Sequence, residues 1–162
     1  TMDDLNEIAN VEAECFPAAE AATKEEFAGR IRYYGNHFWI MLEEDKLIAF
    51  VDGFVTDEAD LTDEMYEKAC LHDEKGAWHN EDGAWQMIFG VNTLPDYRKH
   101  GYAGQLIQCV IKDAREQGRK GLVLTCKEKL IKYYAKFSFV DEGVSDKSTH
   151  GNAVWHQMRL TF

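Results

Sequence analysis

The segment from Trp85 to Ala114 constrains the fold most, because its pattern predicts a strand, a tight turn and an amphipathic helix in succession. The apolar run Trp85–Leu94 is rich in residues that favour strands, and it stops at Pro95. Apolar residues then recur at helical spacing up to Ala114, and Gly118 is the expected C-cap. A strand followed directly by a helix is typical of α/β chains.

The other hydrophobic patterns extend this alternation along the chain. A helix over 5–15 should end at Phe16-Pro17, because a residue before proline is pushed out of the helical region. A second helix should begin at Thr23, which forms a capping box with Glu26. Further strands are expected over 37–42, 47–55, 122–126, 140–143 and 153–160, and a further helix over 129–137. The segment 56–69 is acidic at first and then helical. With 162 residues and no linker-like stretch, we expect a single domain over 1–162.

Composition limits the class of function. The formal net charge of −11 disfavours a nucleic-acid surface and favours a cationic substrate. The alternative is that the acidic residues only keep the protein soluble. The sequence has no long apolar run and no basic-then-apolar leader, so we expect no membrane partner and a cytoplasmic protein. Its four cysteines lack metal-ligand spacing, and we expect no metal.

The turn between the strand and the helix is a candidate anion site. The first turn of a helix leaves backbone N–H groups unpaired at the positive end of the dipole. Small residues at Gly101 and Ala103 let the backbone approach a phosphate, and Arg98, Lys99 and His100 add positive charge. Neither the Walker pattern nor the dinucleotide pattern of glycines fits this turn.

The segment Arg98–Ala103 matches the pattern [RQ]-x-x-G-x-[GA] and resembles the acetyl-CoA pyrophosphate loop of the GNAT superfamily of N-acetyltransferases. Downstream, Tyr134–Phe139 resembles the family's tyrosine-bearing ending, with Ser138 where glycine is usual. Serine adopts the left-handed backbone less readily than glycine. The segment Cys126–Leu130, the pair Leu71-His72 and the third strand are similar to the arylalkylamine N-acetyltransferase branch. The histidines which that branch carries before the loop are absent here.

The resemblance implies a fold and a cosubstrate. The fold would be α/β, with a mixed, mostly antiparallel sheet whose central parallel pair is splayed and whose faces carry helices. The start Thr1–Asp4 resembles the beginning of the family's first helix, so the family's first strand is expected to precede this chain. Acetyl-CoA would contact the strand end at Asn92, Thr93 and Leu94, and the loop at Arg98, Lys99, His100, Gly101, Tyr102, Ala103 and Gly104.

The resemblance also implies direct acetyl transfer to a primary amine, with a small cationic or aromatic amine as the leading acceptor. The backbone N–H of Asn92 would stabilise the oxyanion, and Tyr134 would protonate the leaving thiolate. Candidate acceptor-side residues are Asp52, Glu58 and His72, with Asp52 expected either in a cleft or at a sheet edge. A peptide N-terminus or lysine as acceptor, a non-catalytic acyl-CoA sensor and a nucleotide-binding protein are the alternatives. The chain is expected to be a monomer or a homodimer.

Overall fold

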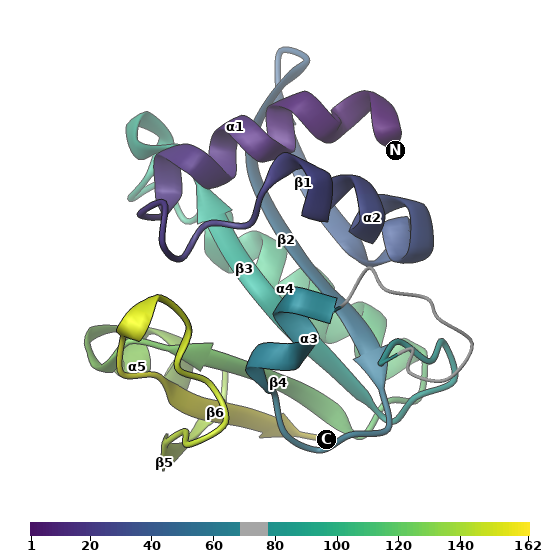
Figure 1. Cartoon of the computed structure of the whole chain (residues 1–162), viewed down its shortest axis with the longest axis vertical. Helices are drawn as coiled ribbons and strands as arrows, with labels where there is room; N and C mark the ends of the chain where they lie inside the picture. Colours follow the sequence, from purple (N-terminus) through teal and green to yellow (C-terminus); the bar gives the residue numbers. More distant parts are fainter. Residues whose placement is uncertain (69–77) are drawn as a thin grey trace.

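Residues 1–68 and 78–162, which the computed structural model describes, form a six-stranded mixed sheet with helices on both faces (Figure 1). The strand order is β1-β2-β3-β4-β6-β5, and the described strands pair antiparallel except β3 with β4. The strands are β1 (Phe38–Glu43), β2 (Lys46–Thr56), β3 (Trp85–Thr93), β4 (Gly121–Cys126), β5 (Val140–Val144) and β6 (His156–Thr161). The predicted α/β class and the mostly antiparallel sheet are confirmed.

Helices α1 and α2 cover one face of the sheet and α4 covers the other (Figure 1). The helices are α1 (Leu5–Cys15), α2 (Lys24–Tyr34), α3 (Asp63–Lys68), α4 (Tyr102–Glu116) and α5 (Ile131–Ala135). The predicted ends of the first two helices are confirmed, since Phe16 is extended and Thr23 and Glu26 form both bonds of the capping box. No helix in the described ranges has the length and apolar character of a membrane span.

Local backbone requirements explain where the elements differ from the predicted ranges. The hairpin turn between β1 and β2 needs only Glu44 and Asp45, both with positive φ, so the strands run closer to the turn than predicted. The last strand begins at His156, later than predicted, because residues 150–152 form a 3-10 turn that accepts a hydrogen bond from the Trp155 indole at 2.9 Å.

The sheet splits between β3 and β4. These strands pair only from Trp85 to Ile88 on β3 and from Gly121 to Leu124 on β4. Directly beyond Ile88, the register of β2 against β3 shifts at Asp52, so that Phe89 is an extra residue on β3. A bulge of this kind bends its strand and increases the local twist. The expected splaying of the central parallel pair is therefore present.

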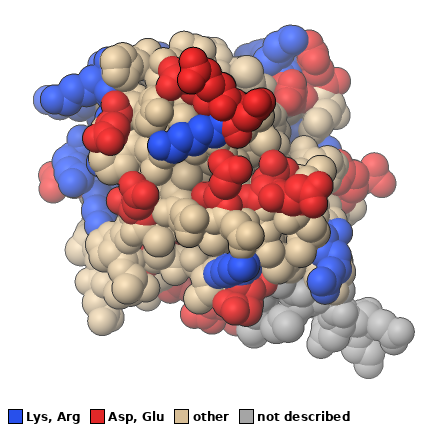
Figure 2. Space-filling model, turned by 90° about the horizontal axis from the view of Figure 1, so that it is seen from above, with Lys and Arg blue, Asp and Glu red and all other residues tan. Residues whose placement is uncertain are grey.

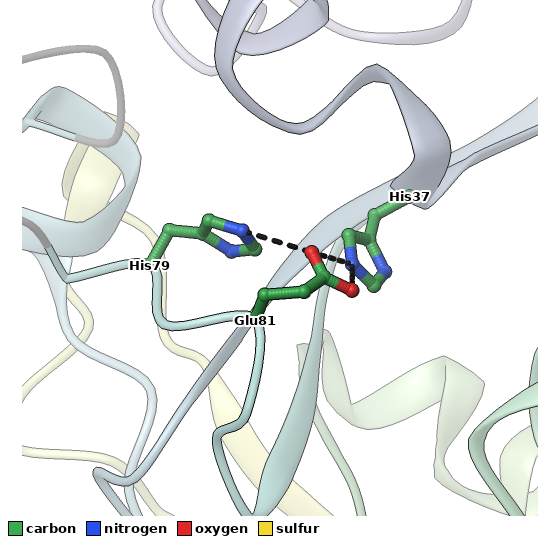
Figure 3. Close-up of side chains that lie close together, drawn as sticks. All are labelled: His37, His79 and Glu81. Atoms are coloured by element: carbon green, nitrogen blue, oxygen red, sulfur yellow. Dashed lines mark hydrogen bonds and ion pairs between the residues drawn. The ribbon is translucent and has the colours of Figure 1, made fainter. Parts of the chain in front are cut away.

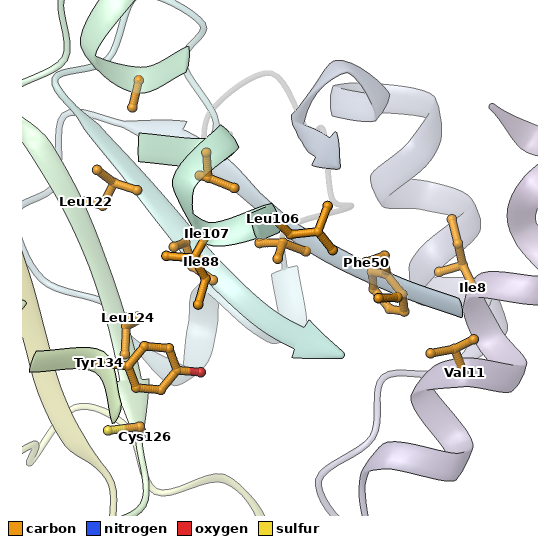
Figure 4. Close-up of a cluster of buried hydrophobic side chains, with 14 of the residues drawn as sticks. Ile8, Val11, Phe50, Ile88, Leu106, Ile107, Leu122, Leu124, Cys126 and Tyr134 are labelled. Carbon is orange, nitrogen blue, oxygen red and sulfur yellow. The ribbon is translucent and has the colours of Figure 1, made fainter. Parts of the chain in front are cut away.

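The hydrophobic core spans both sides of this split. Figure 4 shows it running from Ile8 and Val11 on α1, past Phe50 and Ile88, to Leu124 on β4. Because the same cluster packs against α1, the strands and α4, it fixes the two arms of the sheet relative to each other. A second cluster around Phe54 and Met87 packs beneath α3.

The turn after α5 contains Ser138 at φ 72°, where the left-handed conformation favours glycine. A residue with a β-carbon in this conformation lowers the free energy of unfolding by roughly 1–2 kcal/mol. Glycine lowers it by about 0.5–1 kcal/mol, because glycine makes the unfolded chain more flexible. We therefore expect Ser138→Gly to stabilise the protein by about 0.5–1 kcal/mol in urea unfolding. Ser138→Ala keeps the β-carbon and is the control. Equal stability of the glycine and alanine variants would contradict the strain.

Candidate active site

A cavity of about 800 Å³ lies where the sheet splits. One wall comes from β3, at Ile88–Val91 and Thr93, and the other from β4, at Leu124–Cys126. The ends of α1 and α2, the residues of α5 and the loop at His150 complete it. The cavity is large enough for a small ligand and is lined by groups from elements far apart in the sequence.

The predicted anion loop opens onto this cavity. Gly101, in the left-handed conformation at φ 80°, is the N-cap of α4. Gln105 donates the first helical hydrogen bond, to the Gly101 carbonyl at 3.0 Å, and within the described chain no backbone acceptor pairs with the N–H groups of 102–104. Arg98 Nε donates to the Thr93 carbonyl at 3.1 Å and ties the loop to the end of β3. These unpaired N–H groups at a helix start fit a phosphate of acetyl-CoA.

The register of β3 decides which backbone groups face the split. Leu94 donates to the Ile48 carbonyl directly opposite at 2.9 Å, and the register pairs Asn92 with Phe50. Since hydrogen-bonded pairs alternate along an antiparallel ladder, the N–H of Asn92 is directed to β2. Contrary to the prediction, the groups that face the split are therefore those of Val91 and Thr93. The register of a strand pair, which sets this alternation, cannot be obtained from one strand's sequence.

Tyr134 lines the cavity from α5. It is 7% exposed and packs edge-on against Phe139 at 6.1 Å between ring centroids. Its hydroxyl points away from Leu124 and Cys126, as Figure 4 shows. Burial raises the pKa of Tyr134 above its ordinary range, so the hydroxyl remains protonated near neutral pH. It is therefore available as a proton donor.

Asp52 and Arg30 form a buried ion pair at the α1–α2 side of the cavity. Arg30 Nη1 lies 2.9 Å from Asp52 Oδ2, and both side chains are almost completely buried. The Arg30 guanidinium also lies over the Phe89 ring, 4.8 Å from its centroid. Burial raises the pKa of the Asp52 carboxyl, while the charge of Arg30 opposes the shift. Of the two expected positions for Asp52, the structure shows the cleft, since β2 is an internal strand.

Glu12, which sequence reasoning did not single out, lies beside this pair. It is 6% exposed, lines the cavity and accepts the Ala22 N–H at 3.1 Å through Oε1. Burial, and then the negative charge of Asp52, raises the pKa of Glu12 to about 7. The signal in the sequence was a glutamate four residues after Ile8 on the apolar face of its helix. Arg30 carried the same signal, three residues after Phe27.

An aromatic wall, also missed, closes the acceptor side. His150 stacks on Trp155 with ring centroids 4.1 Å apart and contacts Tyr66 at 4.6 Å. Tyr66 in turn contacts Phe89 at 4.9 Å. Burial lowers the pKa of His150, although a hydrogen bond with Asp63 opposes the change, so the ring is mostly neutral at pH 7. His150 and Trp155 are neighbours in one loop, but Tyr66 and Phe89 come from α3 and β3, so no local pattern could group all four rings.

Two predicted acceptor residues do not join this group. Glu58 is exposed just beyond β2 and does not line the cavity. His72 lies outside the described residues.

Three other side chains, His37, His79 and Glu81, meet outside the cavity (Figure 3). Their possible ligand atoms lie within 4.8 Å of one another. However, His79 Nδ1 accepts the Val55 N–H at 3.2 Å, so its Nε2 carries the proton and donates to Glu81. Arg119 also lies 3.6 Å from the same carboxylate. The donor pattern fits a hydrogen-bonded clamp on the loop before β3 better than a cation site.

Solved structures share this fold. The loading GNATL domain of CurA from Lyngbya majuscula has a TM-score of 0.81 at 15% identity, covering 99% of this chain and 94% of that one. The GphF GNAT-like decarboxylase in complex with isobutyryl-CoA has a TM-score of 0.76 at 16% identity, covering 99% and 96%. The ribosomal-protein-S18-alanine N-acetyltransferase from Escherichia coli has a TM-score of 0.69 at 15% identity, covering 99% and 89%. At such identities the likeness shows the fold alone.

The sequence comparisons give the family. A search of curated protein sequences finds no match. None of the comparisons points to the arylalkylamine branch, which stays a prediction. The model of the acetyltransferase (GNAT) family matches residues 5–139, which is most of the sequence and includes the anion loop, Tyr134 and both carboxylates. The chain therefore belongs to the acetyltransferase (GNAT) family.

Proposed function

We propose that this acetyl-CoA-dependent acetyltransferase acetylates the primary amine of a small cationic molecule with an aromatic group, as an arylalkylamine has. One observation carries the proposal. A single cavity is bounded at one end by the helix start that fits a phosphate, contains the Tyr134 hydroxyl, and is bounded on its acceptor side by buried carboxylates and aromatic rings. Donor, acid and acceptor groups therefore share one space.

The donor half would hold acetyl-CoA mainly through the backbone. The N–H groups of residues 102–104 would bind the pyrophosphate, with Lys99 and His100 exposed beside them. The strand end at Thr93 would pair with the amides of the pantetheine arm. The N–H of Val91 takes the oxyanion role first expected of Asn92, and a preset donor of this kind is worth about 3–4 kcal/mol.

Transfer requires one bond to form and one to break. The amine nitrogen attacks the thioester carbonyl carbon, a C–N bond forms, and the C–S bond breaks with its electron pair on sulfur. The Tyr134 hydroxyl gives its proton to the departing thiolate and is then reprotonated from solvent. Overall an ammonium becomes an amide, coenzyme A leaves as the thiol, and one proton is released.

Charge supports a cationic acceptor. Two buried carboxylates, Glu12 and Asp52, face one guanidinium on the acceptor side. Asp and Glu side chains also predominate over Lys and Arg on the face shown in Figure 2, and the whole chain carries a net charge of −11. A field of this sign raises the local concentration of cations.

The boundary of the cavity supports a small acceptor. Lys127, just after β4, lies 2.8 Å from Glu20 in the loop between α1 and α2, so this ion pair joins the two arms of the split. Lys127 also lies over the Trp155 ring, 5.6 Å from its centroid. Because this ion pair crosses the opening, a single ring with a short aminoalkyl chain would enter the cavity more easily than a polypeptide.

Tyr134→Phe tests the catalytic half of the proposal. Loss of the proton donor should lower kcat by roughly 10²–10⁴-fold and leave the affinity for acetyl-CoA unchanged, as measured by thiol release and calorimetry. Tyr33→Phe, at an exposed tyrosine of α2, is the matched control and should keep the wild-type rate. Wild-type turnover in Tyr134→Phe would exclude the acid role.

An acceptor screen tests the substrate class. With acetyl-CoA as donor, tyramine and 2-phenylethylamine should give higher kcat/KM than spermidine, an aminoglycoside or a short aliphatic peptide with a free N-terminus, because only the first two combine an ammonium with an aromatic ring. Turnover of the peptide alone would support the peptide acetyltransferase instead. Binding of acetyl-CoA without thiol release from any amine would support the sensor.

A further inference from the structure

Two buried carboxylate oxygens converge on one point of the cavity wall, beside Gly90. A β-carbon at residue 90 would lie 3.2 Å from Asp52 Oδ1 and 3.8 Å from Glu12 Oε2, with the Asn92 amide nitrogen at 2.9 Å. Neither oxygen accepts a hydrogen bond within the described chain, although the Asn92 amide is near enough to lower the pKa of Glu12 slightly. Glu12 is 6% exposed and Asp52 is fully buried, yet both line the cavity together with Gly90.

The second oxygen of each carboxylate is already held. Glu12 Oε1 accepts the Ala22 N–H, and Asp52 Oδ2 accepts from Arg30. These bonds orient the carboxylates and leave their other oxygens without partners. A buried acceptor without a donor is costly, so a group with several N–H donors and a positive charge would stabilise both oxygens.

The charge of this region also favours a cation. The charged or titratable groups near Glu12 are Asp52 on β2, Arg30 on α2 and the Cys15 thiol on its own helix, while β3 contributes the neutral Asn92 amide. One guanidinium thus serves two carboxylates. When both are ionised, one negative charge remains uncompensated.

We propose that Glu12 and Asp52 bind the ammonium group of the acceptor beside Gly90, and that Glu12 takes the proton which the amine loses before it attacks. This inference rests on the proposed acetylation of an amine. It assigns the general base that the fold, the anion loop and Tyr134 leave unassigned.

The two carboxylates then have different tasks. Asp52, held by Arg30, remains the anion that binds the ammonium. Glu12 accepts one proton from nitrogen, which gives R–NH₂ and a neutral carboxylic acid, and later releases that proton to solvent. An alkylammonium has a pKa near 10, so transfer to an ordinary glutamate is unfavourable by about 10⁶-fold, but transfer to a group near 7 is unfavourable by about 10³-fold.

Glu12→Gln tests the base with tyramine as the probe. Glutamine keeps the oxygen that accepts the Ala22 N–H, so the loop contact should survive. We expect kcat/KM for tyramine to fall by about 10²–10³-fold, with the KM for acetyl-CoA unchanged. The rise of the wild-type kcat/KM through pH 7 should disappear. Glu14→Gln, which makes the same charge change at an exposed position of α1, should behave as wild type.

Stability gives a readout that does not depend on activity. Because folded Glu12 keeps its proton up to about pH 7 whereas the unfolded side chain loses it near 4.5, the folded state binds more protons in that window. The carboxyl group therefore makes the fold less stable as pH rises from 4.5 to 7. Glu12→Gln should have a higher urea midpoint than wild type at pH 8 and an equal one at pH 4.

The outcomes separate the two proposals. If the wild type acetylates no amine, both fail. If it acetylates tyramine while Glu12→Gln keeps the wild-type rate and pH profile, the role of Glu12 alone is overturned. A stability difference that does not change with pH would overturn the buried ionisation of Glu12.

Tyrosol, in which a hydroxyl replaces the ammonium group of tyramine, tests the ammonium site. It should compete with tyramine at least tenfold more weakly than 2-phenylethylamine does, and equal competition would overturn the ammonium site.

Discussion

The short parallel pairing of β3 with β4 determines most of what this molecule can do. The two strands share a ladder only as far as Ile88 and Leu124, and the extra residue Phe89 turns β3 away at that point. Backbone groups that would otherwise pair within the sheet become free to pair with a ligand. The core packs continuously on both sides of the opening, so the gap can remain open in a stable fold. The cavity is thus a product of strand geometry, and side chains only give it its chemistry.

The chemistry of the acceptor side depends on burial. Arg30 and Asp52 are almost completely buried, and each charge is tolerated because the other is present. Glu12 is buried beside this pair, and its pKa rises because of that burial and then because of the negative charge of Asp52. The Glu12 carboxyl group makes the fold less stable at neutral pH. A glutamine at this position would serve any structural purpose equally well without that cost.

The fold and the donor half of the site could largely be predicted from the sequence, because their signals are local. The stop at Phe16-Pro17, the capping box of Thr23 and the loop before α4 each lie within a few consecutive residues. Most of the acceptor half could not be predicted. Asp52 was expected there, but Glu12, Arg30 and His150 reach the same cavity only through tertiary packing. The role expected of Asn92 failed for a related reason. A shift of one residue in register exchanges the two sides of a strand, and that register is a property of the pair.

Gly90 shows how narrowly the acceptor site is defined. The two carboxylates and the Asn92 amide can approach residue 90 because it has no side chain, and even one methyl group there would crowd Asn92 and Asp52. Donor binding depends on the backbone N–H groups of residues 102–104, which place no such demand on residue 90. Within this architecture, a change at one codon can remove the place for an acceptor while the binding of the acyl donor persists. Acceptor choice and donor binding can therefore diverge separately during evolution.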